Sequence, residues 1–290
     1  MEPLCSPSRN PARDRPTGLV RARVGEDSSE RGREAIATFW VGTSGWQYDS
    51  WKGRFYPRSL PKSAWLAFFA ERFATVEVNN SFYRLPSDAA FERWRDGTPP
   101  GFVIAPKVSR YLTHIRRLRD AAEPMELFWS RARLLGPKLG PMLFQLPPTL
   151  AADEERLASF LKLLPKNARS AFEFRHPSWD SETTRSLLDD AGAALVLADR
   201  PGARVPGHVT GGWSYVRFHQ GTPHGSAYRR AKLRRWADRL VDLPADDVYV
   251  YFNNDPGGAA VRDAATLIEL LETRGANVAA AANVSEAESG

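Results

Sequence analysis

Two glutamates stand in short alternating apolar stretches, where their carboxylates could do acid and base chemistry. Glu77 lies in Val-Glu-Val-Asn, and Glu173 lies in Phe-Glu-Phe-Arg. Alternate residues of a strand face the same side, so Glu77 shares a face with Asn79, and Glu173 shares one with Arg175. Two carboxylates in one site push their pKa values apart, which suits one as acid and one as base. The alternative is structural: Glu77 is tied to Arg84 or Arg175, and the carboxylate pair is neutralised by Arg175, Lys107 and Arg217.

A lysine and a histidine add groups that could carry charge or protons. Lys107 closes an apolar run after Ala-Pro, where it could bind an anion, polarise a carbonyl group or form a Schiff base. His114 lies in the long basic stretch 109–124, where it could be a general acid, a phosphate ligand or a loop-packing residue. We therefore predict Glu77, Glu173, Lys107 and His114 as the catalytic candidates.

Further polar and aromatic residues stand at or near the ends of apolar runs, and we predict that they bind and orient the substrate. Arg217 and His219 are two apart on one run and so point the same way. Asn253 and Asn254 precede a glycine pair that leads into the last helix, either as an anion-binding turn or as a turn alone. The candidates are Asn79, Tyr83, Arg84, Arg117, Gln145, Arg175, His176, Asp199, Arg217, His219, Asn253 and Asn254.

Oxygen and imidazole donors at these positions raise the question of a metal ion. They are Glu77, Glu173, His176, Asp199, His219 and Asp255. The set contains no His-x-x-x-His pair and no tight acidic triad, and basic residues compete with a cation for the carboxylates. We predict no metal ligands and no identified cofactor, with a divalent ion as the less favoured alternative.

Eight short apolar runs, each ending in charged or amide residues, must position these groups. Most are followed by a helix-like segment, a pattern that predicts an α/β fold with a TIM-like (β/α)8 barrel. The segment 200–212 is rich in glycine and proline, so we expect a degenerate crossover after the sixth strand. The C-terminal strand ends of such a barrel meet at one mouth. The runs are 39–43, 75–79, 102–107, 142–145, 171–175, 194–199, 214–219 and 248–253.

Composition sets the boundaries around this barrel. The 290 residues carry a net charge of +6, which favours anionic partners without identifying one. We expect a disordered N-terminal extension over 1–38, the barrel over 39–275 and a flexible tail over 276–290. The single cysteine, Cys5, and the lack of a secretory h-region or an apolar run of about 20 residues point to the cytoplasm rather than a membrane.

Ordered motifs along the chain resemble those of the YecE-like proteins, a family of unknown function. They begin with Gly-Thr-Ser-Gly-Trp at 42–46 and continue through Val-Glu-Val-Asn, Phe-Tyr-Arg-Leu-Pro at 82–86 and Gln-Leu-Pro-Pro at 145–148. Phe-Arg-His at 174–176, Arg-Phe-His at 217–219 and Tyr-Phe-Asn-Asn at 251–254 complete the resemblance, which covers about residues 39–273. It implies a TIM-barrel-like fold and supplies no reaction. Gln220 departs from the expected His-Gly step, so the loop there is expected to differ.

These observations favour an enzyme of hydrolase or lyase type that acts on a small or polymeric anionic substrate bearing phosphate. A redox enzyme is disfavoured because no dinucleotide-binding glycine motif follows the first strand. The alternatives are a nucleic-acid binding or repair protein and a non-catalytic ligand-binding module. Loop aromatics could stack on bases in the former or simply cover the barrel; they are Trp46, Tyr48, Trp51, Phe82, Tyr83 and Trp179.

Overall fold

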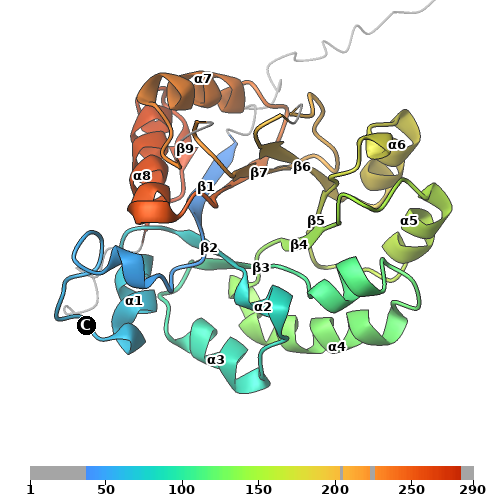
Figure 1. The fold of residues 1–290 in the computed structure, drawn as a ribbon, viewed down its shortest axis with the longest axis horizontal. Coiled ribbons are helices and arrows are strands. Elements are labelled where there is room, and N and C mark those ends of the chain that lie inside the picture. The colour runs from blue at the N-terminus through green and yellow to red at the C-terminus, as the bar shows by residue number, and fades with distance from the viewer. Residues whose placement is uncertain (1–36, 203–204, 223–225, 282–290) are drawn as a thin grey trace, which may run out of the picture. The chain divides into compact units, whose positions relative to one another are not determined.

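A ring of parallel strands surrounded by helices forms the fold of the described residues (Figure 1). The computed structural model describes residues 37–202, 205–222 and 226–281. The strands are β1 Thr38–Ser44, β2 Thr75–Val78, β3 Val103–Pro106, β4 Met142–Gln145, β5 Ser170–Glu173, β6 Ala194–Asp199, β7 Ser214–Phe218, β8 Asp247–Phe252 and β9 Asn277–Val278. The helices are α1 Trp65–Ala70, α2 Asn80–Tyr83, α3 Asp88–Asp96, α4 Ala122–Ala132, α5 Glu154–Leu161, α6 Glu182–Asp190, α7 Arg230–Val241 and α8 Ala259–Glu272.

The strand order confirms the predicted barrel. The path runs β3-β2-β1-β8-β7-β6-β5-β4, every pairing along it is parallel, and single bridges from Ile104 to Leu139 and from Lys107 to Leu143 join its two ends. Consecutive parallel strands connected through helices close into a (β/α)8 barrel because each crossover returns the chain to the same end of the sheet.

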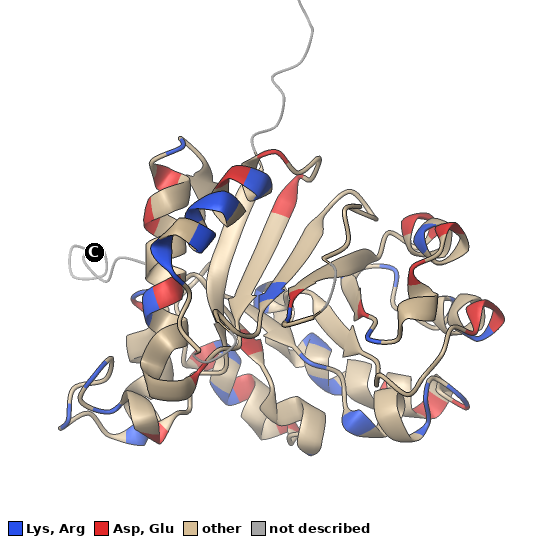
Figure 2. Cartoon of the chain, turned by 45° about the horizontal axis from the view of Figure 1, so that its top comes forward, with Lys and Arg blue, Asp and Glu red and all other residues tan. Residues whose placement is uncertain are grey.

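Strand periodicity divides the buried residues into two hydrophobic clusters. One lies between the sheet and the helices and includes Val76 and Val78 of β2. The other fills the barrel lumen and includes Tyr215 of β7 and Tyr251 of β8. Glu77 stands between the two valines and therefore faces the lumen. Most Lys, Arg, Asp and Glu residues lie on helices and connecting segments, and the strands carry few (Figure 2).

The ladder between β5 and β6 is short. Only two residue pairs, Ala171–Ala194 and Phe172–Leu195, join these strands, whereas four pairs join β6 to β7 and five join β7 to β8. The crossover after β6 contains no helix in its described residues 200–202 and 205–213, which confirms the predicted degenerate crossover. The outer face of the wall is therefore less covered here than elsewhere.

A 3-10 turn over Lys62–Ala64 precedes α1, and α2 directly follows β2. Strand β9 pairs with β1, so ordered structure continues beyond the expected end at residue 275. The predicted N-terminal extension falls almost wholly outside the described residues and stays a prediction. Within the described ranges, no helix has both the length and the apolar character needed to cross a membrane.

Candidate functional site

Arg217 is the centre of the barrel mouth. It projects inward from β7 and is 1% exposed. Its Nε and Nη2 donate to Oε2 and Oε1 of Glu77 at 2.9 and 2.7 Å, and its Nη1 donates to Glu173 Oε2 at 2.5 Å. Ser44 and Tyr215 donate to the two oxygens of Glu77 at 2.6 and 2.7 Å. The residue alternation of β1, β2, β5 and β7 turns all five side chains toward the lumen.

This arrangement keeps both glutamates ionised. Burial alone would raise the pKa of Glu77, but the charge and hydrogen bonds of Arg217 outweigh it and hold that pKa below its usual value. Burial opposes ionisation of Glu173 too, and Arg217, His219 and Arg175 together hold its pKa well below the ordinary range. The two carboxylates in turn raise the pKa of Arg217 despite its burial. The predicted acid/base pair is thus bridged by one guanidinium that satisfies both members.

Lys107 belongs to a second polar group at the mouth. Its Nζ donates to Gln145 Oε1 at 2.9 Å and lies 4.1 Å from the centre of the Phe82 ring. Burial, followed by the nearby positive charge of Arg217, lowers the pKa of Lys107 to about 8. An amine with this pKa exists in both protonation states near neutral pH, so it can hold an anion or exchange a proton.

His114 is coupled to Lys107 through Gln145. The lysine occupies Gln145 Oε1, so Gln145 Nε2 faces His114 Nε2 at 3.4 Å as a donor. His114 Nδ1 then carries the proton and donates to Thr113 Oγ1 at 2.9 Å. Burial and the charge of Lys107 lower the pKa of His114 to about 4, so the imidazole is neutral at ordinary pH. His114 stands on a π-helical turn over Tyr111–Ile115, a backbone form frequent at functional sites.

A second neutral imidazole faces the same space. Asn253 Nδ2 lies 3.2 Å from His219 Nδ1, and because an amide nitrogen can only donate, the His219 proton is on Nε2. That Nε2 is buried, lies 3.7 Å from Glu173 Oε1 and has no hydrogen-bond partner among the described residues. Burial and the charge of Arg217 lower the pKa of His219 to about 3. His219 therefore offers a neutral N–H donor to a bound group.

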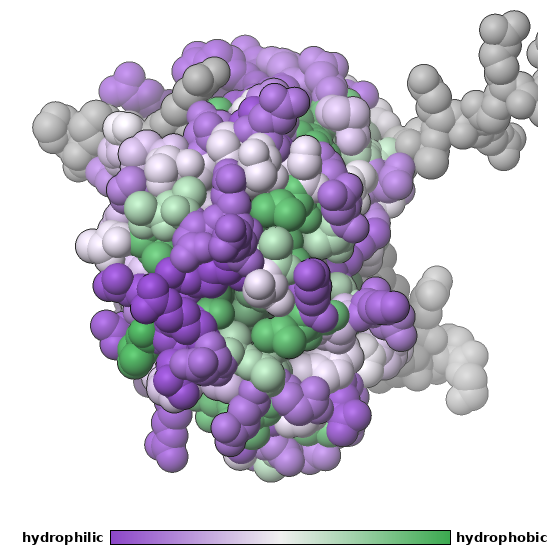
Figure 3. All heavy atoms as spheres, turned by 90° about the vertical axis from the view of Figure 1, so that its right-hand side faces the viewer, coloured by the Kyte–Doolittle hydropathy of each residue, from purple (hydrophilic) through white to green (hydrophobic). Residues whose placement is uncertain are grey.

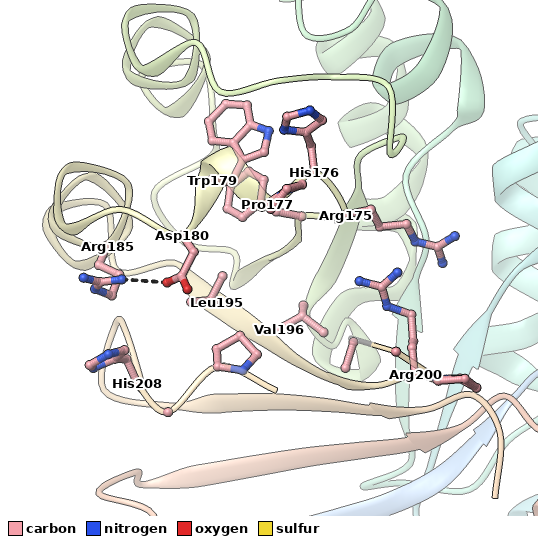
Figure 4. Close-up of a pocket in the computed structure, with 16 residues that line it drawn as sticks. Arg175, His176, Pro177, Trp179, Asp180, Arg185, Leu195, Val196, Arg200 and His208 are labelled. Atoms are coloured by element: carbon pink, nitrogen blue, oxygen red, sulfur yellow. Dashed lines mark hydrogen bonds and ion pairs between the residues drawn. The ribbon is translucent and has the colours of Figure 1, made fainter. Parts of the chain in front are cut away.

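Two further arginines form the rim beside β5 and β6. Arg175 Nε donates to Glu173 Oε1 at 3.0 Å, and the Arg175 and Arg200 guanidinium groups lie near one another (Figure 4). Arg200 Nε is buried without a hydrogen-bond partner in the described part of the chain. Burial lowers the pKa of Arg200, and Arg175 contributes in the same direction. Two neighbouring guanidinium groups, of which only Arg175 is paired with Glu173 among the described residues, attract an anion.

The structure brings most of the predicted residues to this mouth. Those present are Glu77, Lys107, His114, Gln145, Glu173, Arg175, Arg217, His219 and Asn253. Asn79 follows Glu77 on the same face, and its buried Oδ1 has no partner among residues that the structure describes.

Three predicted residues point away from the mouth. Asp199 accepts from Trp236 and forms an ion pair of 2.8 Å with Lys232 of α7. Asn254 donates to Asp263 of α8, and His176 caps the 3-10 turn Pro177–Trp179. Each serves packing or turn formation at its place in the structure.

Three others lie at the surface, Tyr83 at the end of α2 and Arg84 and Arg117 outside the helices. Tyr83 is 81% exposed, and Arg84 and Arg117 are exposed as well. Arg117 has a φ of 52°, and its carbonyl accepts from Arg156. Their positions depend on loop conformation, which strand alternation does not determine.

Most of the loop aromatics cover the barrel rather than face solvent. Trp46 and Trp179 are each 4% exposed and Trp51 is fully buried, so they leave no stacking surface for a nucleic acid. For metal ligation, the described residues contain no group of three or more His, Cys, Asp or Glu side chains arranged to hold an ion.

The site also contains residues absent from the predicted set. They are Ser44, Tyr215 and Arg200, which bind Glu77 or extend the positive rim. Each lies two positions from a residue that faces the lumen, so the alternation along the strands could have predicted all three.

The fold and the mouth define a class: a single-barrel protein with a buried Glu-Arg-Glu cluster and a positively charged rim. The chain belongs to the family described as "Protein of unknown function DUF72", which matches residues 40–288. This confirms the resemblance drawn from the motifs, since the YecE-like label is a close relative of this family.

Individual relatives agree in sequence and in fold. UPF0759 protein YunF of Bacillus subtilis (strain 168) is 28% identical over 270 residues, which cover 80% of this chain and 94% of YunF. The crystal structure of a DUF72 family protein from Thermotoga maritima MSB8 is 29% identical, has a TM-score of 0.74 and matches 81% of this chain and 99% of that one. A DUF72 family crystal structure from Enterococcus faecalis V583 shares the fold at 20% identity, with a TM-score of 0.68 and coverage of 82% and 99%.

Proposed function

We propose that this protein is an enzyme of hydrolase or lyase type that binds an anionic, phosphate-bearing substrate at the C-terminal mouth of the barrel. The observation that carries the proposal is the charge balance there. Four basic side chains surround the two buried carboxylates, and Arg217 alone already engages both of those carboxylates. The positive charge in excess lies on Lys107, Arg175 and Arg200, which favours a bound anion.

The proton-handling groups in this proposal are Lys107, His114 and His219. Lys107, with its pKa of about 8, can release or accept a proton near neutral pH. The His114 and His219 imidazoles are neutral, and His219 presents its Nε2–H to the substrate as a hydrogen-bond donor. Such a donor stabilises negative charge that develops on a substrate oxygen, in the manner of an oxyanion hole.

Glu77 and Glu173 take a positioning role here. They are held as anions by Arg217, so neither is poised to deliver a proton as the acid of an acid/base pair. Their negative charge keeps Arg217 in place and sets the electrostatic potential around Lys107. This assignment replaces the acid/base hypothesis for the two glutamates within the same proposed reaction class.

A binding and turnover screen on the full chain tests the proposal. Phosphometabolites, nucleotides, carboxylates and short oligonucleotides are tested by thermal shift, and each ligand that stabilises the protein is then assayed for product by mass spectrometry. Lys107→Ala should weaken the binding of a phosphorylated ligand by about tenfold or more and reduce its turnover by about a hundredfold. Lys166→Ala is the matched control, because this lysine is exposed and precedes the opposite end of β5.

The outcomes separate the competing functions. A phosphorylated ligand that binds without turnover, with Glu77→Gln reducing affinity, would replace the enzyme by a ligand-binding module. If no anion stabilises the wild-type protein, or if Lys107→Ala binds as well as Lys166→Ala, the proposal is wrong.

Nucleic-acid binding is a second candidate because of the loop surface near the mouth. Tyr83 and Tyr111 are exposed there, and Arg116 lies 5.5 Å from the Tyr111 ring centre. Exposed aromatic and basic side chains can bind a single strand by stacking and by phosphate contacts. Stabilisation by oligonucleotides alone, falling steeply with salt concentration, would favour this candidate.

A further inference from the structure

A cavity of about 830 Å³ opens in the barrel wall beside the mouth. Its lining comes from the ends of β5 and β6, from the start of α6 and from the crossover that follows β6 (Figure 4). Small-molecule sites typically measure about 300–1,000 Å³, so this cavity has the size of a ligand site. None of the proton-handling groups named above lines it.

The cavity exists because β5 and β6 separate. Their pairing ends at Phe172 and Leu195. The residues beyond, Phe174 just after β5 and Val196 on β6, line the cavity instead of continuing the ladder. No helix in the described residues of the next crossover covers the opening. Arg175 lines the cavity and also bonds Glu173, so the cavity and the mouth are neighbours that share this residue.

The two ends of the cavity differ in charge. Arg175 and Arg200 lie together at the end next to the mouth. At the α6 side, Arg185 is paired with Asp180 at 3.0 Å and is thereby neutralised. An excess of positive charge is therefore present only at the mouth end of the described lining.

Between these ends the wall combines apolar side chains with polar ones such as His176 and His208. The apolar lining residues include Phe174, Trp179, Leu195, Val196 and Pro206. The face that carries α5 and α6 shows hydrophobic patches among hydrophilic residues (Figure 3). A group of apolar side chains beside a cationic end is complementary to an organic anion with an apolar body.

We propose that this cavity binds the apolar, ring-sized body of an organic phosphate-type anion whose charged group lies between Arg175 and Arg200. The inference rests on the proposed function, since the anionic group is the one assigned to the mouth. It adds the substrate class: a phosphorylated compound with an apolar body, rather than inorganic phosphate or a highly polar sugar phosphate.

Two matched probes test the inference on the full chain. Methylphosphonate and phenylphosphonate carry the same charged group and differ in the body attached to it, and their carbon–phosphorus bond resists hydrolysis. Calorimetric titration of the wild-type protein should show phenylphosphonate binding about tenfold or more tightly, because the ring leaves water for an apolar cavity.

Two variants fill the cavity without altering the arginines. Leu195→Trp adds bulk at a partly buried lining position, and it should bring the affinity ratio of the two probes to about one while methylphosphonate still binds. Gly207→Trp is the second variant, since a β-carbon at this lining glycine would meet no heavy atom within 4 Å and the fold should tolerate it. Leu163→Trp, at an exposed position before β5, is the matched control and should keep the wild-type ratio.

The results distinguish this inference from the function on which it rests. If wild type binds both probes equally, or if both cavity variants keep the preference for phenylphosphonate, the cavity assignment is wrong while anion binding at the mouth stands. If wild type binds neither probe, the anion site itself fails, and the proposed function fails with it.

Discussion

The core of the mouth and its rim handle charge in opposite ways. In the core, Arg217 is fully enclosed and bonds both glutamates, and Ser44 and Tyr215 complete the partners of Glu77. At the rim, Arg200 has a buried nitrogen for which the described residues provide no partner. A satisfied buried network stabilises one arrangement, whereas an unsatisfied charge at a cavity is available to a ligand.

Side chains that stabilise the fold and side chains that are available to a ligand are therefore neighbours in this mouth. Removing a member of the core leaves a buried charge uncompensated, which costs folding free energy. Removing a member of the rim takes away a charge that the protein itself leaves unpaired, so folding should lose little and ligand affinity should fall. The predictions below use this difference.

Arg217→Met should have the largest effect. It leaves Glu77 and Glu173 buried without their shared cation, so the free energy of unfolding should fall by about 3–5 kcal/mol. Urea unfolding monitored by tryptophan fluorescence measures this directly. The triple variant Glu77→Gln, Glu173→Gln, Arg217→Met removes all three charges and should recover part of the loss. A single variant within about 1 kcal/mol of wild type would contradict the view of the core as a coupled network.

Arg200→Gln should have an intermediate effect, on affinity rather than stability. Loss of a guanidinium contact should weaken methylphosphonate binding by about tenfold to a hundredfold, with the free energy of unfolding unchanged or slightly raised. Arg185→Gln is a matched control, since Arg185 lines the same cavity but already pairs with Asp180. Equal losses in the two variants would show that the rim attracts anions through general charge and not through Arg200.

The same contrast explains how far the sequence could predict the site. The eight apolar runs predict the barrel. Alternation along these runs predicts the core residues of the mouth, because every second residue of a strand faces the lumen. His176, Asp199 and Asn254 each lie one position out of phase with the inward residues Arg175, Ala198 and Asn253. A polar residue at a strand end is therefore not sufficient to predict a side chain in the mouth, and residue alternation excludes all three.

Other features had no comparable signal in the sequence. Residue alternation along β6 predicts that Arg200 faces the same side as Ala198. It does not predict the separation of β5 from β6 or the resulting cavity, because these depend on how many residue pairs the two strands form. Arg84 and Arg175 are the partners expected for Glu77 alone, and Arg217 is expected only as one of three residues that neutralise the carboxylate pair. In the structure Arg217, from five strands later in the chain, bonds both carboxylates. Contacts between distant strands are set by barrel closure and stagger, which local sequence does not report.

The smallest predicted effect concerns the pH dependence of Lys107, which stands between core and rim. With a pKa of about 8, its ammonium is mostly charged at about pH 7 and mostly neutral at about pH 8.5. Sulfate keeps its charge over this range, so its affinity should fall about fourfold between these pH values in wild type and stay flat in Lys107→Met.

The folded pKa of Lys107 lies below its unfolded value, so the unfolded chain binds one more proton than the folded chain between about pH 8 and 10.5. Unfolding free energy should therefore rise with pH across that window more in wild type than in Lys107→Met. Parallel pH profiles for the two proteins would mean that Lys107 titrates like an exposed lysine and that the mouth does not tune it.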